Sequence, residues 1–196
     1  MEVLLPTAYA GNIEYYSLFF RAENPVLEAS EQYVKQTFRN RCSIYSTNGK
    51  LDLSIPVFRK NHMLVTDIKI NNQDNWKNLH WKSITSAYKK SPFFEFYDVE
   101  LKTVLDKDYG YLLDFNLAMH EFICQSLQID SNFNKTSFYK KNLDSTDYRK
   151  TLSPKVKSEF KHKKYIQVFS DTSEFIPNLS ILDLIFCEGP NAVSYL

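Results

Sequence analysis

Glycine is scarce in this sequence, and its scarcity limits how a nucleotide could bind. The 196 residues include only four glycines, Gly11, Gly49, Gly110 and Gly189, and no two of them fit a glycine-rich phosphate loop. Such loops need several residues without a Cβ where the backbone approaches the phosphate. We therefore expect any bound nucleotide to be held by side chains or by a helix N-terminus.

The chain also has no excess of charge and no long apolar run. Lys and Arg number 24 against 23 Asp and Glu, so the formal net charge of +1 creates no field that favours nucleic acid or an anionic membrane. The apolar stretch 179–187 is interrupted by Asp183 and is far shorter than the roughly 20 residues of a membrane-spanning helix. The N-terminus shows no signal-peptide pattern. We expect a cytoplasmic protein with no membrane span, and the charge balance argues against a nucleic acid partner.

The three cysteines, Cys42, Cys124 and Cys187, lie far apart and never form a C-x-x-C pair. This pattern is typical of reduced thiols in a reducing compartment. His120 and Glu121 begin an H-E-x-x-H zinc motif, but Cys124 takes the place of its second histidine. The sequence therefore predicts no metal site and no cofactor.

Apolar and aromatic residues are abundant enough to build one folded domain over residues 1–196. Hydrophobic residues make up 43% of the chain and aromatic residues 15%. The length matches one compact domain with a shared core. Much of that core must consist of aromatic rings, many of which carry a polar group.

The first thirty residues have the pattern of a β-α-β unit. Residues 3–6 predict an apolar strand, and 12–21 predict an amphipathic helix capped by Asn12. A second short strand follows at 25–29. Two strands joined by a helix in this way are parallel, and ligand loops in such folds follow the strand ends.

Three antiparallel strands are predicted next. Side chains alternate over 33–45, with one basic and polar face. Asn48-Gly49 is a strong hairpin signal, and the chain returns over 51–56. Residues 64–70 predict the third strand.

Helices dominate the middle of the chain, and the regular pattern weakens after them. Apolar side chains recur with helical periodicity over 75–90, 93–105 and 111–127. Residues 129–164 are polar, and a last strand is predicted at 165–169. Asn178 is expected to cap a final helix over 179–186.

These elements predict the α/β fold class. We expect a single mixed domain with a small parallel core from the first and last strands, an inserted antiparallel hairpin region and a helical middle. The alternative is an α+β fold with one antiparallel sheet.

His80 is the strongest single candidate for chemistry. It lies one turn after Trp76, on the core-facing side of its predicted helix. A half-buried imidazole can act as a general base or orient a phosphate. The alternative is a structural histidine whose ring is held by a backbone carbonyl.

Lys35, Arg39 and Arg41 place three cations on one face of a predicted strand, within roughly 14 Å of each other. Cations this close repel one another unless acids or an anion lie among them. Glu28 and Glu31 could be those acids, in an internal ion-pair network. A substrate phosphate or carboxylate could instead bind the two arginines with bidentate geometry.

Other polar residues have two interpretations each. Asp114 and Asn116 lie at the start of a predicted helix, and Asp147 and Arg149 form a D-x-R pair. Each is compatible with a site, and each is typical of a helix cap or a local ion pair. The basic run 149–164 is either a solvated loop or a lid over an anionic ligand.

Six blocks of sequence keep a distinctive order and spacing: 6–12 (PTAYAGN), 33–41 (YVKQTFRNR), 53–57 (LSIPV), 76–84 (WKNLHWKSI), 87–94 (AYKKSPFF) and 178–186 (NLSILDLIF). Together they resemble the WbqC-like protein family over nearly the whole chain. The resemblance implies a role in the biosynthesis of bacterial O-antigen and other surface polysaccharides. It further implies transfer of a small acyl or aminoacyl group, such as glycine, to an amino sugar. The pocket residues that it points to are Tyr9, Asn12, Tyr15, Lys35, Gln36, Arg39, Asn40, Arg41, Trp76 and His80.

The leading hypothesis is a transferase acting on a small-molecule substrate, an amino sugar linked to a nucleotide or a carrier, with an acyl or aminoacyl donor. Arg39 and Arg41 would hold a phosphate, and His80 would accept the proton of the attacking amine. Tyr9 and Trp76 would form walls of the pocket. The alternative is a non-catalytic module that binds a sugar nucleotide or a partner enzyme. A third hypothesis, nucleic acid binding through 149–164, predicts a steep dependence of binding on salt.

Overall fold

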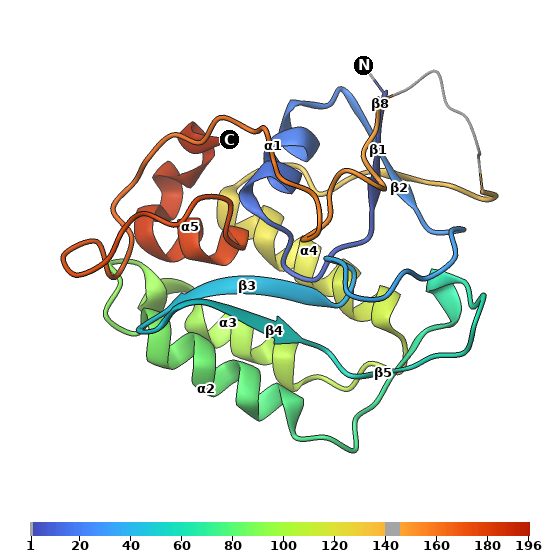
Figure 1. Cartoon of the computed structure of the whole chain (residues 1–196), viewed down its shortest axis with the longest axis horizontal. Helices are drawn as coiled ribbons and strands as arrows, with labels where there is room; N and C mark the ends of the chain where they lie inside the picture. Colours follow the sequence, from blue (N-terminus) through green and yellow to red (C-terminus); the bar gives the residue numbers. More distant parts are fainter. Residues whose placement is uncertain (1, 140–145) are drawn as a thin grey trace.

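The chain begins with the β-α-β unit that its sequence predicts. The computed structural model describes residues 2–139 and 146–196 (Figure 1). β1 (Glu2–Pro6) and β2 (Asn24–Glu28) pair in parallel and are joined by α1 (Ile13–Arg21). The Asn12 side chain accepts a hydrogen bond from the backbone N–H of Tyr15 at 3.0 Å, which confirms Asn12 as the N-cap of α1.

Two very short strands complete the parallel sheet. β7 (Asn134–Lys135) pairs with β2, and β8 (Thr146–Asp147) pairs with β1, giving the order β7-β2-β1-β8. Both strands lie in the polar stretch 129–164, of which residues 140–145 are outside the described part of the chain. The structure therefore confirms a parallel core, but its outer strands come from this polar stretch.

The predicted last strand at 165–169 is wrong, because this segment is a loop. Its alternating pattern has another cause. The side chains of Tyr165 and Gln167 point inward because both donate hydrogen bonds to the buried carboxylate of Asp183. Ile166, between them, is 79% exposed.

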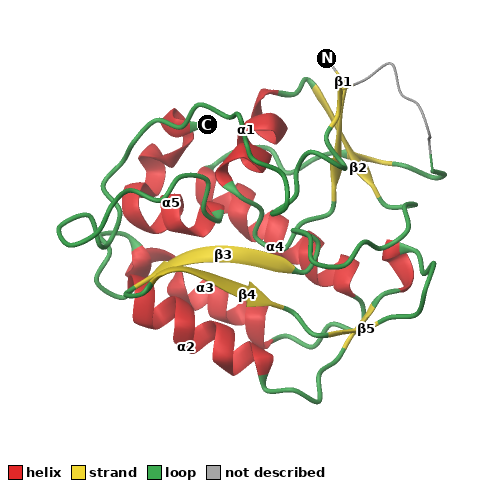
Figure 2. Cartoon of the chain, viewed as in Figure 1, coloured by secondary structure: helices red, strands yellow, loops and turns green. Residues whose placement is uncertain are grey.

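A β-hairpin forms the second layer of the molecule (Figure 2). β3 (Arg41–Ser46) and β4 (Gly49–Ser54) pair in antiparallel register, with Ser46 opposite Gly49 at the turn. Gly49 has a φ of +93°, a conformation that favours glycine. The Asn48-Gly49 hairpin is confirmed.

The predicted antiparallel region over 33–70 is confirmed, but it contains two separate pairs of strands instead of three strands with the predicted bounds. β5 (Val57–Phe58) and β6 (Lys69–Ile70) form a separate pair. Residues 33–40 form a loop of bends and turns rather than a strand, with Gln36 at a φ of +58°. A short 3-10 helix, Val65–Asp67, interrupts the segment before β6.

The helical middle is confirmed. Helices α2 (Trp76–Tyr88), α3 (Phe94–Asp106) and α4 (Leu112–Leu127) end within two residues of the predicted bounds. Near the C-terminus, α5 (Ile181–Glu188) leads into the 3-10 helix Gly189–Tyr195. Helix α2 packs on β3, as α5 does, and α3 packs on α4, so the hairpin lies between helices (Figure 1).

The cap of α5 differs from the prediction. Ser180 caps this helix, and its hydroxyl accepts a hydrogen bond from the backbone N–H of Leu182 at 3.3 Å. Asn178 has a φ of +57° and instead accepts a hydrogen bond from the backbone N–H of Glu14, at the start of α1. Its amide also donates to the Glu14 carboxylate at 3.0 Å. Asn178 therefore joins the N-termini of two helices that lie far apart in the sequence.

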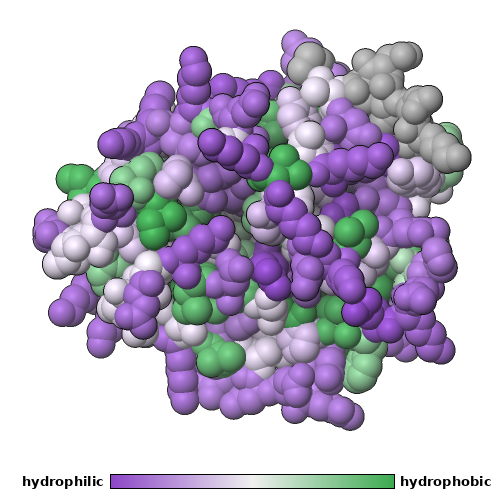
Figure 3. Space-filling model, in the orientation of Figure 1, coloured by the Kyte–Doolittle hydropathy of each residue, from purple (hydrophilic) through white to green (hydrophobic). Residues whose placement is uncertain are grey.

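The fold is mixed α/β around one shared hydrophobic core. Every residue of α5 from Ile181 to Cys187 is buried, including Asp183. The face seen in Figure 3 is mainly hydrophilic, with apolar side chains in scattered positions. Among the described residues, no helix is both long enough and apolar enough to cross a membrane.

Candidate functional site

Charged side chains gather where the parallel strands end. β1, β2 and β8 end at Pro6, Glu28 and Asp147, and because the strands are parallel these ends share one edge of the sheet. Ligands of open α/β sheets bind outside this edge. We call the group found there the edge network, and it consists of Glu28, Glu31, Arg39, Asp147 and Arg149.

The first half of the edge network is a buried bidentate ion pair. Arg39 Nε donates to Glu31 Oε1 at 2.7 Å, and Arg39 Nη2 donates to Glu31 Oε2 at 2.6 Å. A third bond runs from Arg39 Nη1 to Thr37 Oγ1 at 3.2 Å. Arg39 is only 2% exposed, so the sequence-based ion-pair interpretation is confirmed for Arg39 and Glu31.

The second half is centred on Arg149, which is also buried. Arg149 Nη1 donates to Glu28 Oε2 at 2.7 Å, and Arg149 Nη2 donates to Asp147 Oδ2 at 2.7 Å. The hydroxyl of Thr136, next to β7, donates to Glu28 Oε1 at 2.5 Å. Glu28 thus pairs with Arg149, not with Arg39, and the D-x-R pair is a structural ion pair.

A cavity of about 440 Å3 opens beside the edge network. We call it the edge cavity. Its volume falls in the range of small-molecule sites. Its lining consists of Ser30, Glu31, Gln32, Val34, Leu64, Tyr139, Arg149 and Lys150.

The lining combines an acid of unusual pKa with positive charge. Burial raises the pKa of Glu31 above its usual value, although the Arg39 guanidinium beside it opposes the shift. The Arg149 guanidinium lies 4.7 Å from the centroid of the Tyr139 ring, and the exposed Lys150 follows it in the chain. The wall of the edge cavity therefore combines an acid whose pKa is raised with the basic residues Arg149 and Lys150.

Helix α4 is joined to the edge network by the hydrogen bonds of Asn116. The side-chain amide of Asn116 donates to Thr7 Oγ1 at 3.0 Å and to the backbone carbonyl of Arg39 at 2.8 Å. The N-cap role considered for Asn116 is wrong, because it lies inside α4, which begins at Leu112.

The other predicted cations do not join Arg39. Arg41 is partly exposed and bonds to β4, with Nε 3.1 Å from Ser54 Oγ and Nη1 3.5 Å from Asp52 Oδ2. Lys35 and Gln36 lie on the exposed turn before β3. Because residues 33–40 are not a strand, their cations do not share one face.

Three of the predicted pocket residues form a separate aromatic cluster. The Tyr9 hydroxyl lies 2.9 Å from His80 Nδ1, and their rings are stacked with centroids 5.6 Å apart. Trp76 meets the His80 ring edge-on at 5.1 Å. Burial lowers the pKa of His80 to about 4, so the imidazole is neutral at physiological pH.

The remaining pocket residues have structural contacts. Asn12 caps α1, and the buried Tyr15 packs edge-on against Tyr16 with ring centroids 5.2 Å apart. The side-chain amide of Asn40 donates to the backbone carbonyl of Ile55 at 2.9 Å, which joins the turn to the end of β4.

His120 and Cys124 lie close together inside the core. His120 Nε2 is 3.5 Å from Cys124 Sγ and 3.2 Å from the carbonyl oxygen of Ser131. Within residues 2–139 and 146–196, no cluster of three or more His, Cys, Asp or Glu side chains could hold a metal ion.

Two basic side chains of the run 149–164 form hydrogen bonds within the protein. Arg149 belongs to the edge network, and Lys163 Nζ donates to the backbone carbonyl of Ser194 at 2.5 Å.

Sequence reasoning missed the position of Glu31 in a cavity wall and the link from Glu28 to Arg149. The D-x-R pair of Asp147 and Arg149 was the available signal. The partner of each charge depends on how the strands are ordered, which a single sequence does not show.

Comparison with known proteins gives a family match and a distant relative. The sequence matches the WbqC-like protein family over residues 7–167. It is also similar to the uncharacterized protein Rv1507c of Mycobacterium tuberculosis, with 23% identity over 214 residues that cover 93% of this chain and 91% of that protein. No solved structure gives a significant match.

Proposed function

The chain belongs to the WbqC-like protein family, and we propose that it is a transferase of bacterial O-antigen biosynthesis. The proposed reaction takes place in the cytoplasm and moves an acyl or aminoacyl group, such as glycine, onto the amine of an amino sugar. The sugar is linked to a nucleotide or a carrier. We place the reaction in the edge cavity.

The observation that supports this proposal is the position of Glu31. Glu31 lines the edge cavity and is 5% exposed, and burial raises the pKa of its carboxyl group. Acyl transfer to an amine needs a group that removes a proton from the nitrogen, and a base works best when its pKa lies near the working pH. Glu31 is the acid of the edge network that fits this role.

The proposed step conserves atoms and charge. The amine nitrogen attacks the acyl carbon, a carbon–nitrogen bond forms, and the bond from the acyl carbon to its leaving group breaks. The Glu31 carboxylate accepts the proton that the nitrogen loses and passes it to the leaving group. Arg39, which holds both carboxylate oxygens, is a positioning residue in this scheme.

The basic side of the edge cavity suits the phosphates of a sugar nucleotide or carrier. Lys150 is exposed at the cavity, and Tyr139 offers a ring on which a nucleobase or sugar could stack. Arg149 is already held by Glu28 and Asp147, so Lys150 is the cation that we expect to contact the phosphate.

His80 is the second candidate for the base. Its low pKa, about 4, makes it a weak proton acceptor, and its Nδ1 is engaged by Tyr9. The acid limb of a pH–rate profile separates the two candidates. An acid limb whose apparent pKa lies above the ordinary Glu value of about 4.3, and which is unchanged in His80→Asn, supports Glu31. An acid limb with an apparent pKa near 4 that disappears in this variant supports His80.

The experiment blocks the edge cavity without breaking an ion pair. Val34 lines the cavity and is 49% exposed, so Val34→Trp should fold and fill part of the space. Val99→Trp, at a 68% exposed position on α3, is the matched control. The purified proteins are incubated with amino-sugar nucleotides and acyl or aminoacyl donors, and products are detected by mass spectrometry. We expect product with the wild type and the control only, and equal product from all three would place the reaction elsewhere.

A non-catalytic sugar-nucleotide or partner-binding module is the alternative function. The bidentate ion pair between Arg39 and Glu31 favours this alternative, because a carboxylate whose two oxygens already accept hydrogen bonds is suited to a fixed recognition surface. Binding of an amino-sugar nucleotide that Val34→Trp abolishes, without product from any donor, would support this alternative over the transferase.

A further inference from the structure

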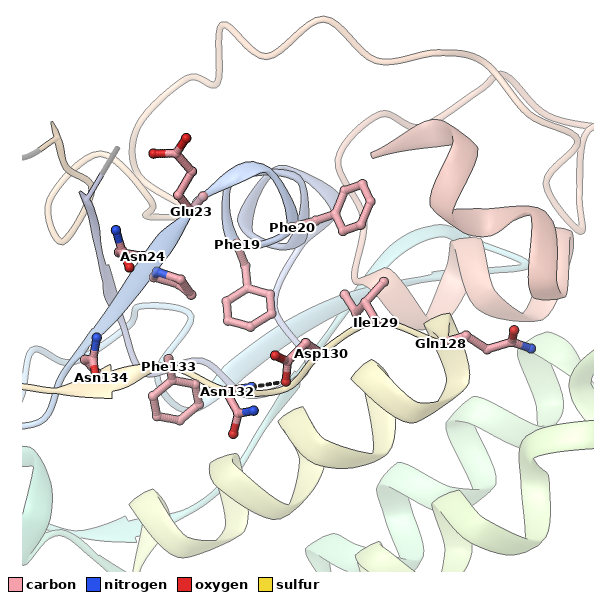
Figure 4. A pocket seen from close by; sticks show the side chains of 12 residues that line it. Phe19, Phe20, Glu23, Asn24, Gln128, Ile129, Asp130, Asn132, Phe133 and Asn134 are labelled. Atoms are coloured by element: carbon pink, nitrogen blue, oxygen red, sulfur yellow. Dashed lines mark hydrogen bonds between the residues drawn. The ribbon is translucent and has the colours of Figure 1, made fainter.

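A second cavity lies at the opposite edge of the parallel sheet, where β2 and β7 begin (Figure 4). We call it the rear cavity. Its volume is about 590 Å3, which suits a small-molecule ligand. It is lined by Phe19, Phe20, Ala22, Glu23, Asn24, Pro25, Gln128, Ile129, Asp130, Asn132, Phe133 and Asn134.

The rear cavity has aromatic rings in its wall. In Figure 4, Phe19 points from α1 toward the segment that carries Phe133 and Asp130. Behind them, the buried His120 ring meets Phe19 edge-on at 4.7 Å and Phe133 edge-on at 5.2 Å. His120 therefore packs against both rings from the core side. Phe20, 43% exposed, adds a third ring to the wall.

Amides and carboxylates supply the polar part of the lining, and cations do not. Asn24 begins β2 and Asn134 begins β7, so their amides stand on neighbouring strands (Figure 4). Asn132 and Asp130 lie on the loop before β7. The lining includes no Lys or Arg.

Two side-chain cations of the described segments next to the cavity make other contacts. The Arg21 guanidinium, at the end of α1, donates to the backbone carbonyl of Leu196. Lys135 lies over Phe133, with Nζ 6.0 Å from the ring centroid, and is not part of the cavity lining. Burial lowers the pKa of His120 to about 4, so this ring adds no charge at neutral pH.

We infer that the rear cavity binds a saccharide unit that is uncharged or carries an amine. Aromatic faces pack against the C–H faces of sugar rings, and amides and carboxylates accept and donate hydrogen bonds at the hydroxyl groups. A carboxylate also suits a sugar ammonium group. Phosphate and other anions are disfavoured here because the lining carries acids and no base.

This site is separate from the edge cavity and does not depend on the proposed transfer reaction. The two cavities lie at opposite ends of β2, since one is lined by Asn24 at its start and the other by Ser30 and Glu31 just after its end. The rear cavity would bind sugar even if the protein catalysed no reaction.

The test measures binding of defined sugars to the whole protein by NMR. The probes are the methyl glycosides of glucose, glucosamine and N-acetylglucosamine, with N-acetylneuraminic acid as an anionic sugar and inorganic phosphate as a simple anion. We expect at least one of the glycosides to shift amide signals of residues 19–25 and 128–134, and the two anions to leave these signals unchanged.

Matched aromatic variants test the wall of the rear cavity. Phe20→Ala removes one exposed ring of the lining, and Phe96→Ala removes a ring that is 71% exposed on α3 and outside the cavity. We expect Phe20→Ala to weaken glycoside binding about two- to tenfold and Phe96→Ala to leave it unchanged. Asn132→Trp, which fills the cavity from an exposed position, should abolish binding.

Three results would overturn the inference. These are the absence of shifts at residues 19–25 and 128–134 with all three glycosides, preferential binding of the anions at these residues, or equal effects of Phe20→Ala and Phe96→Ala. Because the readout needs no turnover, failure of the transferase proposal would not produce any of them.

Discussion

Arg39 and Arg41 stand two residues apart in the sequence, and their guanidinium groups have different environments. Arg39 is 2% exposed and forms a bidentate ion pair with Glu31. The Arg41 side chain is 29% exposed, and its Nη1 lies 3.5 Å from Asp52 Oδ2, which makes a longer and more solvated ion pair. A buried charge that loses its partner is costly, while a solvated pair contributes little. The two ion pairs should therefore respond differently to mutation.

Glu31→Leu is expected to lower the free energy of unfolding by about 3 kcal/mol or more, because it leaves the Arg39 guanidinium buried without the carboxylate that accepts two of its hydrogen bonds. Asp52→Asn removes the partner of Arg41 and should cost at most about 1 kcal/mol, because that pair is partly solvated. Urea unfolding at neutral pH measures both. The double variant Glu31→Leu with Arg39→Met should recover much of the loss, and equal losses in the two single variants would contradict the argument.

The burial of His80 predicts how stability depends on pH. The pKa of His80 is about 4 in the folded protein and about 6.5 when the chain is unfolded. Between these values the unfolded state binds a proton that the folded state does not, so stability is full above pH 6.5 and falls as the pH decreases toward 4. His80 alone should account for about 2–3 kcal/mol of this loss at pH 4.5.

His80→Asn should reduce the loss of stability between pH 7 and pH 4.5 by about 2–3 kcal/mol, while the contribution of His120, whose pKa is also about 4, remains. Urea midpoints of wild type and variant at the two pH values measure the difference. An NMR titration of the imidazole carbon-bound protons gives an independent check, and a His80 signal that titrates near pH 6.5 would contradict the prediction.

At the scale of elements, segments with a strong local signal were predictable. The helical periodicity of α2, α3 and α4 and the Asn12 cap of α1 were visible in the sequence, and the structure confirms them. The Asn48-Gly49 turn was visible for the same reason, because its geometry depends on the local chain.

Elements defined by distant contacts were not predictable. β7 and β8 have two residues each and exist because β1 and β2 offer free edges. Residues 165–169 alternate like a strand because Asp183 binds Tyr165 and Gln167 from inside the core. The same limit hid the edge cavity, whose lining combines residues 30–34 with residues more than a hundred positions later.

The β3–β4 hairpin depends on one glycine, so two glycines make a matched test. Gly49→Ala should destabilise the protein by about 1 kcal/mol, because an L-residue rarely adopts the φ of +93° found at the turn. Gly110→Ala should be neutral or slightly stabilising, because a Cβ there meets no atom within 4 Å and no positive φ is required. Thermal unfolding followed by circular dichroism measures both, and similar melting temperatures for the two variants would contradict the role of Gly49.

At the scale of the whole molecule, polar bonds join the parallel sheet to the helical half. The Tyr9–His80 bond links the loop after β1 to α2, and Asn116 links α4 to Thr7. The backbone N–H of Ile13 donates to the carbonyl of Leu179 at 3.0 Å, which joins α1 to the segment before α5. All of these contacts surround one continuous hydrophobic core.

These links predict that residues 1–196 unfold as a single domain. Trp76 and Trp81 both lie on α2, so tryptophan fluorescence reports on the helical half, and hydrogen exchange of the β1 amides reports on the parallel sheet. In urea, the fluorescence transition should coincide with the circular dichroism transition, and the slowest β1 amides should exchange with the global free energy of unfolding. The prediction would be contradicted if the β1 amides exchanged with a free energy of opening clearly lower than the free energy of unfolding measured by tryptophan fluorescence. The sheet would then unfold as a separate unit, and the bonds from Asn116 of α4 would not stabilise the edge network.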